Sequence, residues 1–123
     1  MKFILDTHIL LWWLADDKKL SLQIREIITD PKNIIYVSSI NIWEIEIKKS
    51  LGKLQAPEID SEIIAKCQFE ELPIYIKHVS ALKSLPNYHN DPFDRLLICQ
   101  SIVEKAQLLT DDSLIAKYQF NKS

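Results

Sequence analysis

Three apolar residues lead directly into an acid near the start of the chain, in Phe3-Ile4-Leu5-Asp6-Thr7-His8. A short run this apolar is typical of a strand buried on both faces, as in parallel sheets. Asp6 would then lie at the carboxyl end of that strand, where open α/β sheets bind their ligands. We expect a helix to follow at once, with the Thr7 hydroxyl capping its free backbone N–H groups. Taken alone, this stretch also fits a role for Asp6 as a helix cap or turn residue only.

Length and composition are those of a soluble globular domain. The chain has 123 residues, of which 47% are hydrophobic and 26% are charged. A chain of this size buries roughly two-thirds of its unfolded surface. The longest apolar run, from Ile9 to Ala15, is far too short to cross a bilayer, and the N-terminus has no secretory signal pattern. We therefore expect one domain over residues 1–123, no membrane segment and a cytoplasmic location.

Charge and residue usage exclude several classes of site. The net charge of -2 gives no overall basic field of the kind that favours nucleic-acid binding, although an acidic active site lowers the total even beside a basic rim. Cys67 and Cys99 stand alone and are expected to be reduced, and the three histidines form no zinc pattern. The single glycine, Gly52, excludes the glycine-rich loops that cradle nucleotide phosphates.

Strand-like and helix-like segments alternate along the chain. Besides the first strand, the short apolar runs predict strands at residues 33–37, 72–76 and 107–110. We expect helices at residues 8–15, 21–28, 40–51, 60–69, 77–85, 92–105 and 113–118, and a tail or edge strand at 119–123. Asp91 as N-cap and Pro92 at the first helical position suit the start of the sixth helix. The alternation predicts an α/β fold with a parallel sheet.

Four acids follow, or lie near, the carboxyl ends of these strands: Asp6, Glu44, Asp94 and Asp112. Glu44 belongs to an otherwise apolar arc of its helix, where a carboxylate needs a partner or a metal. Because parallel strands end at one edge of a sheet, the fold is able to bring these distant residues together. Each acid alone also fits a structural role. Asp94 would interact favourably with the positive end of a helix dipole, and Asp112 would act as a helix cap.

Carboxylates that share a pocket raise one another's pKa unless a cation lies between them. Oxygen ligands without cysteine or histidine suit Mg²⁺ or Mn²⁺ better than zinc. Such a site typically hydrolyses phosphodiesters, because the metal lowers the pKa of bound water and offsets charge on the phosphoryl oxygens. If the four acids do converge, the pattern predicts metal-dependent phosphodiester hydrolysis, and the structural role of each acid remains the alternative.

Four segments carry further information as motifs. They are Phe3-Ile4-Leu5-Asp6-Thr7-His8-Ile9-Leu10-Leu11-Trp12-Trp13-Leu14; Trp43-Glu44-Ile45 with Lys48 and Leu51-Gly52-Lys53-Leu54; His89-Asn90-Asp91-Pro92-Phe93-Asp94-Arg95-Leu96-Leu97-Ile98; and Leu109-Thr110-Asp111-Asp112. In this order, and over nearly the whole chain, they resemble the motifs of PIN-domain ribonucleases of the VapC toxin type.

The resemblance implies a PIN-like three-layer fold, with a central, mainly parallel sheet of about four or five strands flanked by helices. It also implies an endoribonuclease that depends on Mg²⁺ or Mn²⁺ and acts as the toxin of a toxin–antitoxin pair. Asp6, Glu44, Asp94 and Asp112 match the family's acidic quartet. Asp6 and Asp94 would be the principal metal ligands, and the other two would ligate directly or through water. The implied partners are RNA, a cognate antitoxin and a second copy in a homodimer.

Residues beside these motifs are candidates for supporting roles. Thr7, Ser39 and Thr110 have hydroxyls able to bond an acid or the substrate phosphate, although a local backbone cap is the more ordinary role. Asp91 is either a ligand or, as its place before proline favours, a helix cap. The cations Lys48, Lys49, Lys53 and Arg95 either bind RNA phosphates around the cleft or form solvated helix faces.

Three other interpretations remain open. A receiver-type phosphoacceptor domain has a similar length and class, but it would need a lysine where Asp111 follows Thr110. A haloacid-dehalogenase-like phosphatase would need a second acid two residues after Asp6, where His8 stands. A PIN-like module without activity would only bind RNA or a protein, and four converging carboxylates argue against that.

Overall fold

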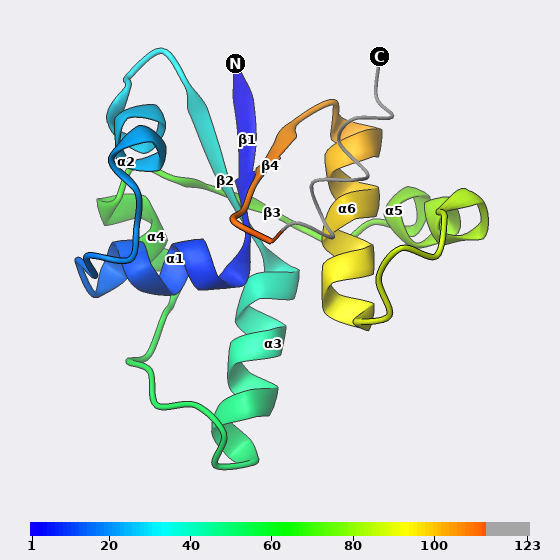
Figure 1. Cartoon of the computed structure of the whole chain (residues 1–123), viewed down its shortest axis with the longest axis horizontal. Coiled ribbons are helices and arrows are strands. Elements are labelled where there is room, and N and C mark those ends of the chain that lie inside the picture. Colours follow the sequence, from blue (N-terminus) through cyan, green and yellow to red (C-terminus); the bar gives the residue numbers. More distant parts are fainter. Residues whose placement is uncertain (113–123) are drawn as a thin grey trace.

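The central feature of the computed structural model is an all-parallel sheet, and the structure describes residues 1–112 (Figure 1). Its strands are β1 (Lys2–Leu5), β2 (Ile34–Ser38), β3 (Glu70–Leu72) and β4 (Gln107–Leu109). They are arranged in the order β3-β2-β1-β4, and every neighbouring pair is parallel. The expected parallel α/β architecture is thus confirmed, with four strands among the described residues.

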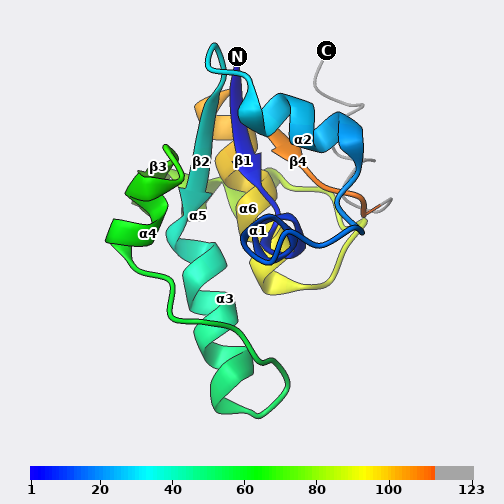
Figure 2. The ribbon, with the colours of Figure 1, turned by 90° about the vertical axis from the view of Figure 1, so that its left-hand side faces the viewer.

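Helices cover both faces of this sheet, with α1, α2 and α4 on one side and α5 and α6 on the other (Figures 1 and 2). The helices are α1 (Thr7–Leu14), α2 (Leu22–Thr29), α3 (Ser39–Ser50), α4 (Ser61–Lys66), α5 (Ile76–Ser80) and α6 (Pro92–Glu104), with a 3₁₀ turn, η1, at Ala81–Ser84. α3 continues below the strand ends, away from the sheet (Figure 1). No helix in the described part of the chain is long and apolar enough to cross a membrane.

The sequence of the strands explains the two layers of core. Successive side chains of a strand point to opposite faces. Phe3 and Leu5 therefore belong to one buried cluster, and Ile4 between them belongs to the other. The side chains of β4 alternate in the same way, with Leu109 in the first cluster and Leu108 in the second. Such continuous apolar runs are expected where helices pack on both faces of a parallel sheet.

Two predicted elements differ from the structure because of proline and backbone geometry. The strand expected at residues 72–76 is wrong: β3 ends at Leu72, and α5 begins at Ile76. Pro73 follows Leu72 directly and has no N–H to continue the ladder. The helix expected at residues 60–69 ends at Lys66, because the chain then turns through Gln68, with φ of 62°, into β3.

Other boundaries also shift. The single helix expected at residues 77–85 is instead α5 followed by the 3₁₀ turn η1. The expected helix at 113–118 and the tail or edge strand at 119–123 lie outside the described residues. The remaining strands and helices agree with expectation within about two residues at each end, which is the usual uncertainty of such boundaries.

Buried polar contacts join the end of β2 and helix α5 to α6. The Ser38 hydroxyl donates to Gln100 Oε1 at 2.6 Å, and Gln100 Nε2 donates to the Pro73 carbonyl at 3.1 Å. His78 is fully buried and contacts Glu104 Oε2 through Nε2 at 2.7 Å. Because buried polar groups are costly to leave unpaired, this network fixes how α6 sits against the end of β2.

Two isoleucines on α6 provide a test of the core. Ile98 is 2% exposed and Ile102 is 43% exposed. Ile98→Ala should reduce the free energy of unfolding by about 2–5 kcal/mol, because it leaves a cavity in the core. Ile102→Ala should cost under about 1 kcal/mol. Urea denaturation of both variants checks this, and equal losses would contradict the described packing of α6.

Candidate active site

One open pocket lies at the edge of the sheet where the strands end. It is lined by Asp6, His8, Trp12, Glu44, Lys48, Asp91, Asp94, Asp111 and Asp112. Six of these residues are acids, and Lys48 is the only lysine or arginine among the described residues that line it. All four members of the predicted acidic quartet therefore meet in one place, although the chain separates them widely.

Asp6 lies at the end of β1, where it is 3% exposed. Its Oδ1 accepts from the Thr7 backbone N–H at 2.7 Å, and its Oδ2 accepts from the Thr110 hydroxyl at 2.8 Å. Asp6 is thus the N-cap of α1, so the expectation that the Thr7 hydroxyl caps this helix is wrong. Burial raises the pKa of Asp6, and the hydrogen bond from Thr110 only partly opposes that rise.

Glu44 enters the pocket from α3 and is also 3% exposed. Its Oε1 accepts from the Thr7 hydroxyl at 2.7 Å, and its Oε2 pairs with Lys48 Nζ at 2.6 Å. Thr7 in turn accepts from Asn41 Nδ2 at 3.0 Å, and the same amide donates to the Leu5 carbonyl. The carboxylate is therefore held by groups from both α1 and α3. Its hydrogen bond raises the pKa of Lys48, which keeps the ammonium charged.

Asp91 and Asp94 occupy the first turn of α6. Asp91 is its N-cap, and its Oδ1 accepts from the N–H groups of Phe93 at 2.8 Å and Asp94 at 3.0 Å, with Pro92 at the first helical position. The side chain of Asp94 is 16% exposed. Burial first, then the charges of Asp6 and Asp91, raises the pKa of Asp94 to about 7.

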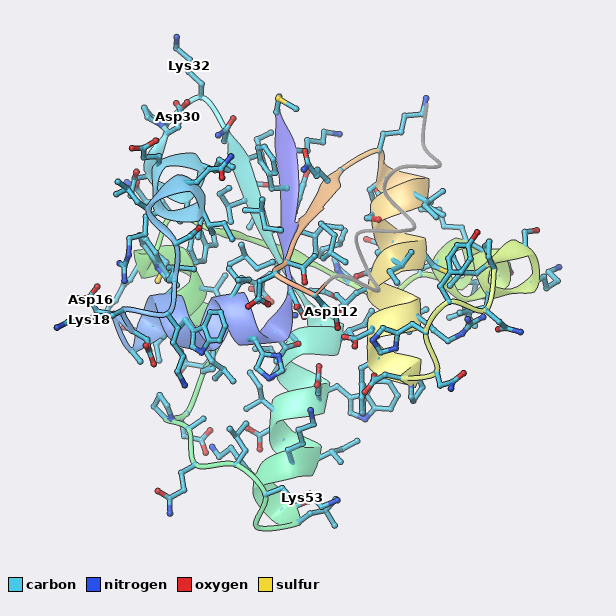
Figure 3. All side chains as sticks on the ribbon, viewed as in Figure 1. Asp16, Lys18, Asp30, Lys32, Lys53 and Asp112 are labelled. Carbon is cyan, nitrogen blue, oxygen red and sulfur yellow. The ribbon has the colours of Figure 1, made fainter. Side chains whose placement is uncertain are left out.

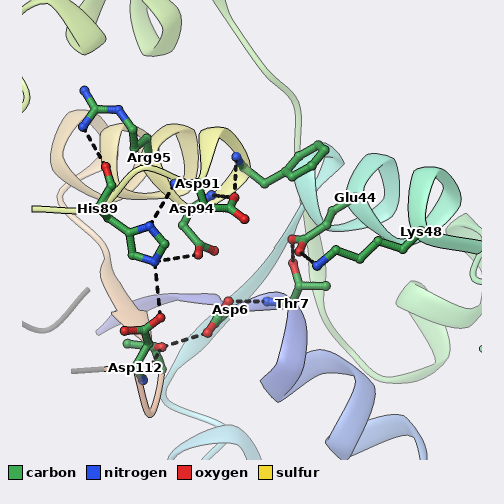
Figure 4. A network of polar contacts seen from close by, with 11 residues as sticks. Asp6, Thr7, Glu44, Lys48, His89, Asp91, Asp94, Arg95 and Asp112 are labelled. Carbon is green, nitrogen blue, oxygen red and sulfur yellow. Dashed lines mark hydrogen bonds and ion pairs between the residues drawn. The ribbon is translucent and has the colours of Figure 1, made fainter. Parts of the chain in front are cut away.

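His89 connects the two sides of the pocket, and reasoning from the sequence missed it. Its Nε2 lies 3.0 Å from Asp94 Oδ2 and 3.4 Å from Asp112 Oδ2, and its Nδ1 accepts from the Asp91 N–H at 3.0 Å (Figure 4). One side-chain nitrogen or oxygen of each of His89, Asp94 and Asp112 lies within 4.8 Å of those of the other two. The signals in the sequence were the place of His89 two residues before the helix cap and its position at the start of the third motif.

The last strand contributes Asp112 through a short turn after β4. The Asp112 N–H donates to the Thr110 hydroxyl at 3.0 Å, and that hydroxyl donates to Asp6. Thr110 therefore holds Asp112 beside Asp6. Asp111 is exposed and also borders the pocket.

The other predicted residues divide between the pocket and its surroundings. Ser39 is the exposed first residue of α3, and the cap is its neighbour Ser38, whose hydroxyl accepts from the Ile40 N–H. Lys49 pairs with Glu46 and Glu58 at 3.8 and 3.7 Å.

Two further predicted cations lie away from the carboxylates. Lys53 lies just past the C-terminal end of α3, which is the end remote from Asp112 (Figure 3). Arg95 Nη1 donates to the carbonyls of Pro86 and His89, each at 3.2 Å. Arg95 therefore braces the loop that carries His89, and Lys48 is the predicted cation closest to the acids.

The chemistry of the pocket fits a hard divalent cation. Its donors are mainly carboxylate oxygens, and the raised pKa values of Asp6 and Asp94 reflect burial and unrelieved repulsion. A cation placed between such groups removes the repulsion and favours their ionised form. Mg²⁺ and Mn²⁺ prefer these oxygen ligands.

Stability without metal should depend on pH through Asp94. The pKa of Asp94 rises from its ordinary value of 3.8 to about 7 in the folded state, so the folded protein binds more protons than the unfolded chain between these two pH values. Stability should therefore fall as the pH rises from about 4 to 7, with each pKa unit worth about 1.4 kcal/mol. Asp94→Asn should weaken this dependence, and saturating Mg²⁺ should do the same in the wild type. Melting temperatures across this range test both, and an identical pH slope in the variant contradicts the assignment.

A solved structure shares this architecture. The chain is similar to the crystal structure of VapBC2 from Rickettsia felis bound to a DNA fragment from their promoter, with a TM-score of 0.62 and 18% sequence identity. The match covers 91% of this chain and 88% of that chain. Because the sequence identity is low, this likeness shows only that the two chains share a fold.

Comparison of sequences gives a consistent result. No curated protein matches the chain. The model of the PIN domain matches residues 3–121, which include all four converging acids. The resemblance expected from the motifs is therefore confirmed, and the chain belongs to the PIN-domain family.

Proposed function

We propose that this protein is a divalent-metal-dependent endoribonuclease, built as one PIN domain over residues 1–123, and that it acts as the toxin of a toxin–antitoxin pair. The observation that carries the proposal is the convergence of Asp6, Glu44, Asp94 and Asp112 in one pocket. Family membership supports it, since the resemblance to PIN-domain ribonucleases rests on motifs that contain these acids.

The four acids would hold the ion in a defined arrangement. Asp6 and Asp94 are the proposed principal ligands, and Glu44 and Asp112 bind directly or through water. When bound, Mg²⁺ or Mn²⁺ lowers the pKa of water and offsets charge on the phosphoryl oxygens. The hydrogen bonds from Thr7 and Thr110 keep the carboxylate of Asp6 in place before any ion binds, which reduces the reorganisation that binding requires.

Lys48 is the cation best placed to meet an RNA phosphate. It borders the pocket, its side chain is 36% exposed, and its ammonium already contacts a site carboxylate. A cation here counters repulsion between the acids and the phosphodiester. The cations Lys49, Lys53 and Arg95 are not among the described residues that line the pocket, so their contribution to RNA binding is expected to be smaller.

The proposal includes two protein partners, a cognate antitoxin and a second copy of the chain in a homodimer. The likeness to VapBC2 supports the antitoxin. Exposed apolar side chains on and beside α5 are consistent with a protein contact: Tyr75 is 52% exposed, Ile76 is 85% exposed and Val79 is 47% exposed. An antitoxin that blocks the acidic pocket would suitably present an arginine, which forms paired hydrogen bonds with carboxylates.

Cleavage of a mixed RNA pool by the purified protein tests the activity. We expect cutting with Mg²⁺ or Mn²⁺ and none with EDTA. Asp6→Asn, Asp94→Asn and Glu44→Gln should each reduce the rate by about a hundredfold or more, because each removes a proposed ligand. Glu46→Gln is the matched control, since Glu46 lies on the same helix with its side chain 53% exposed.

The outcomes separate the interpretations. Variants that cut as well as the wild type, with circular dichroism showing them folded, would attribute the activity to a contaminant. A wild type that binds Mn²⁺ and RNA but cuts no RNA, including total cellular RNA, would favour the binding module without activity.

A second pair of variants tests RNA binding by Lys48. Lys48→Gln should raise KM for RNA several-fold and reduce the slope of log KM against log salt by about one, since one phosphate contact is lost. Lys49→Gln should change neither, because Lys49 does not line the pocket and pairs instead with Glu46 and Glu58. Steady-state kinetics at several salt concentrations measure this, and equal effects would refute the special role of Lys48.

A further inference from the structure

His89 occupies the loop before α6, and its side chain is 13% exposed. Its ring lies between two segments that no backbone ladder joins: the first turn of α6, and the residues after β4 (Figure 4). Contacts within the described residues hold the ring at both nitrogens, with Asp91 at Nδ1 and with Asp94 and Asp112 at Nε2. A ring held on both nitrogens has a defined orientation and a defined proton position.

The contact at Nδ1 determines where the proton lies. The Asp91 N–H donates to Nδ1 at 3.0 Å, and a ring nitrogen that accepts a hydrogen bond carries no proton itself. The proton of the neutral ring is therefore on Nε2. That N–H faces Asp94 Oδ2 at 3.0 Å and Asp112 Oδ2 at 3.4 Å, both of them acceptors.

We infer that His89 is a positioning residue, which donates from Nε2 to the facing oxygens of Asp94 and Asp112 and does not itself bind the metal. The inference rests on the proposed function, since it assigns a role within that site. Ligation by Nε2 would need its lone pair, and the proton would have to move to Nδ1. A proton on Nδ1 would point at the Asp91 N–H, so that two donors would face each other where a hydrogen bond now exists.

The role has a clear physical purpose. Without a donor between them, the oxygens of Asp94 and Asp112 would face each other with like charge. With it, the facing Oδ2 atoms of the two aspartates share the Nε2–H of His89 as a common donor. On the opposite side Thr110 joins Asp112 to Asp6, so His89 completes a continuous link from β1 through the turn after β4 to α6. Partners of this kind typically change metal affinity by about 10–100-fold.

Three substitutions separate the two ring nitrogens. In His89→Gln the side-chain amide reaches near the position of Nε2 and is able to donate there. In His89→Asn the amide lies near Nδ1 and does not reach the two carboxylates, and His89→Ala removes both contacts. Electron paramagnetic resonance of free Mn²⁺ should show affinity weakened at least about tenfold in the Asn and Ala variants. The Gln variant should lie within about threefold of the wild type, with melting temperatures showing that all are folded.

Two spectroscopic measurements do not require activity. Long-range ¹H–¹⁵N spectra of the metal-free protein should show the Nε2–H tautomer for His89, and electron spin echo modulation of the Mn²⁺-loaded protein should show no directly bound imidazole nitrogen. An Nδ1–H tautomer, a bound nitrogen signal, or wild-type Mn²⁺ affinity in the Ala variant would each overturn the inference. A wild type that binds no Mn²⁺ would overturn both proposals. Loss of Mn²⁺ affinity in His89→Ala, with no RNA cleavage by the wild type, would refute the nuclease alone.

Discussion

The carboxylate of Asp6 is the group on which the site depends. It is buried at the end of the central strand β1 and accepts one hydrogen bond from each side, from the Thr7 N–H and the Thr110 hydroxyl. The first bond starts α1, and the second ties the turn after β4 to the strand beside it. A buried carboxylate without such partners would be strongly unfavourable. The capping of a helix and the assembly of the site are therefore the same interaction.

The remaining acids extend from this centre in two directions. Toward α3, Thr7 joins Asp6 to Glu44, because its backbone N–H donates to Asp6 and its hydroxyl donates to Glu44, whose second oxygen pairs with Lys48. Toward α6, Thr110 and His89 lead through Asp112 to Asp94. Each acid thus has a fixed neighbour, and yet the pKa values of Asp6 and Asp94 stay raised. The protein brings the charges together at a cost in stability, as sites that bind a cation commonly do.

The parts of the structure that follow from local rules were predictable from the sequence. The apolar run before Asp6 specifies a buried strand, Asp91 with Pro92 specifies the start of α6, and parallel strands must end at a common edge. Two errors show where local rules stop. Residues 72–76 have the composition of a strand, but Pro73 ends the ladder. Ser38 and Ser39 are equivalent as sequence, and only the packing of α3 selects Ser38 as the cap.

Contacts between distant segments were beyond such rules. His89 and Asp112 are 23 residues apart in sequence, yet the loop before α6 brings Nε2 of His89 to 3.4 Å from Oδ2 of Asp112. Arg95 has the residue type expected of a phosphate ligand, but the loop carbonyls of Pro86 and His89 accept from it instead. No periodicity or spacing of the chain encodes these two facts.

The hydrogen bond between Thr110 and Asp6 spans 104 positions of the chain. A growing polypeptide that has emerged as far as α6 already contains Asp6, Glu44 and Asp94, but it lacks β4, Thr110 and Asp112. Contacts of such long sequence separation form late, because they close a large loop. The pocket therefore gains its full set of carboxylates only after β4 has docked beside β1, and a nascent chain that stops short of Asp112 lacks the complete site.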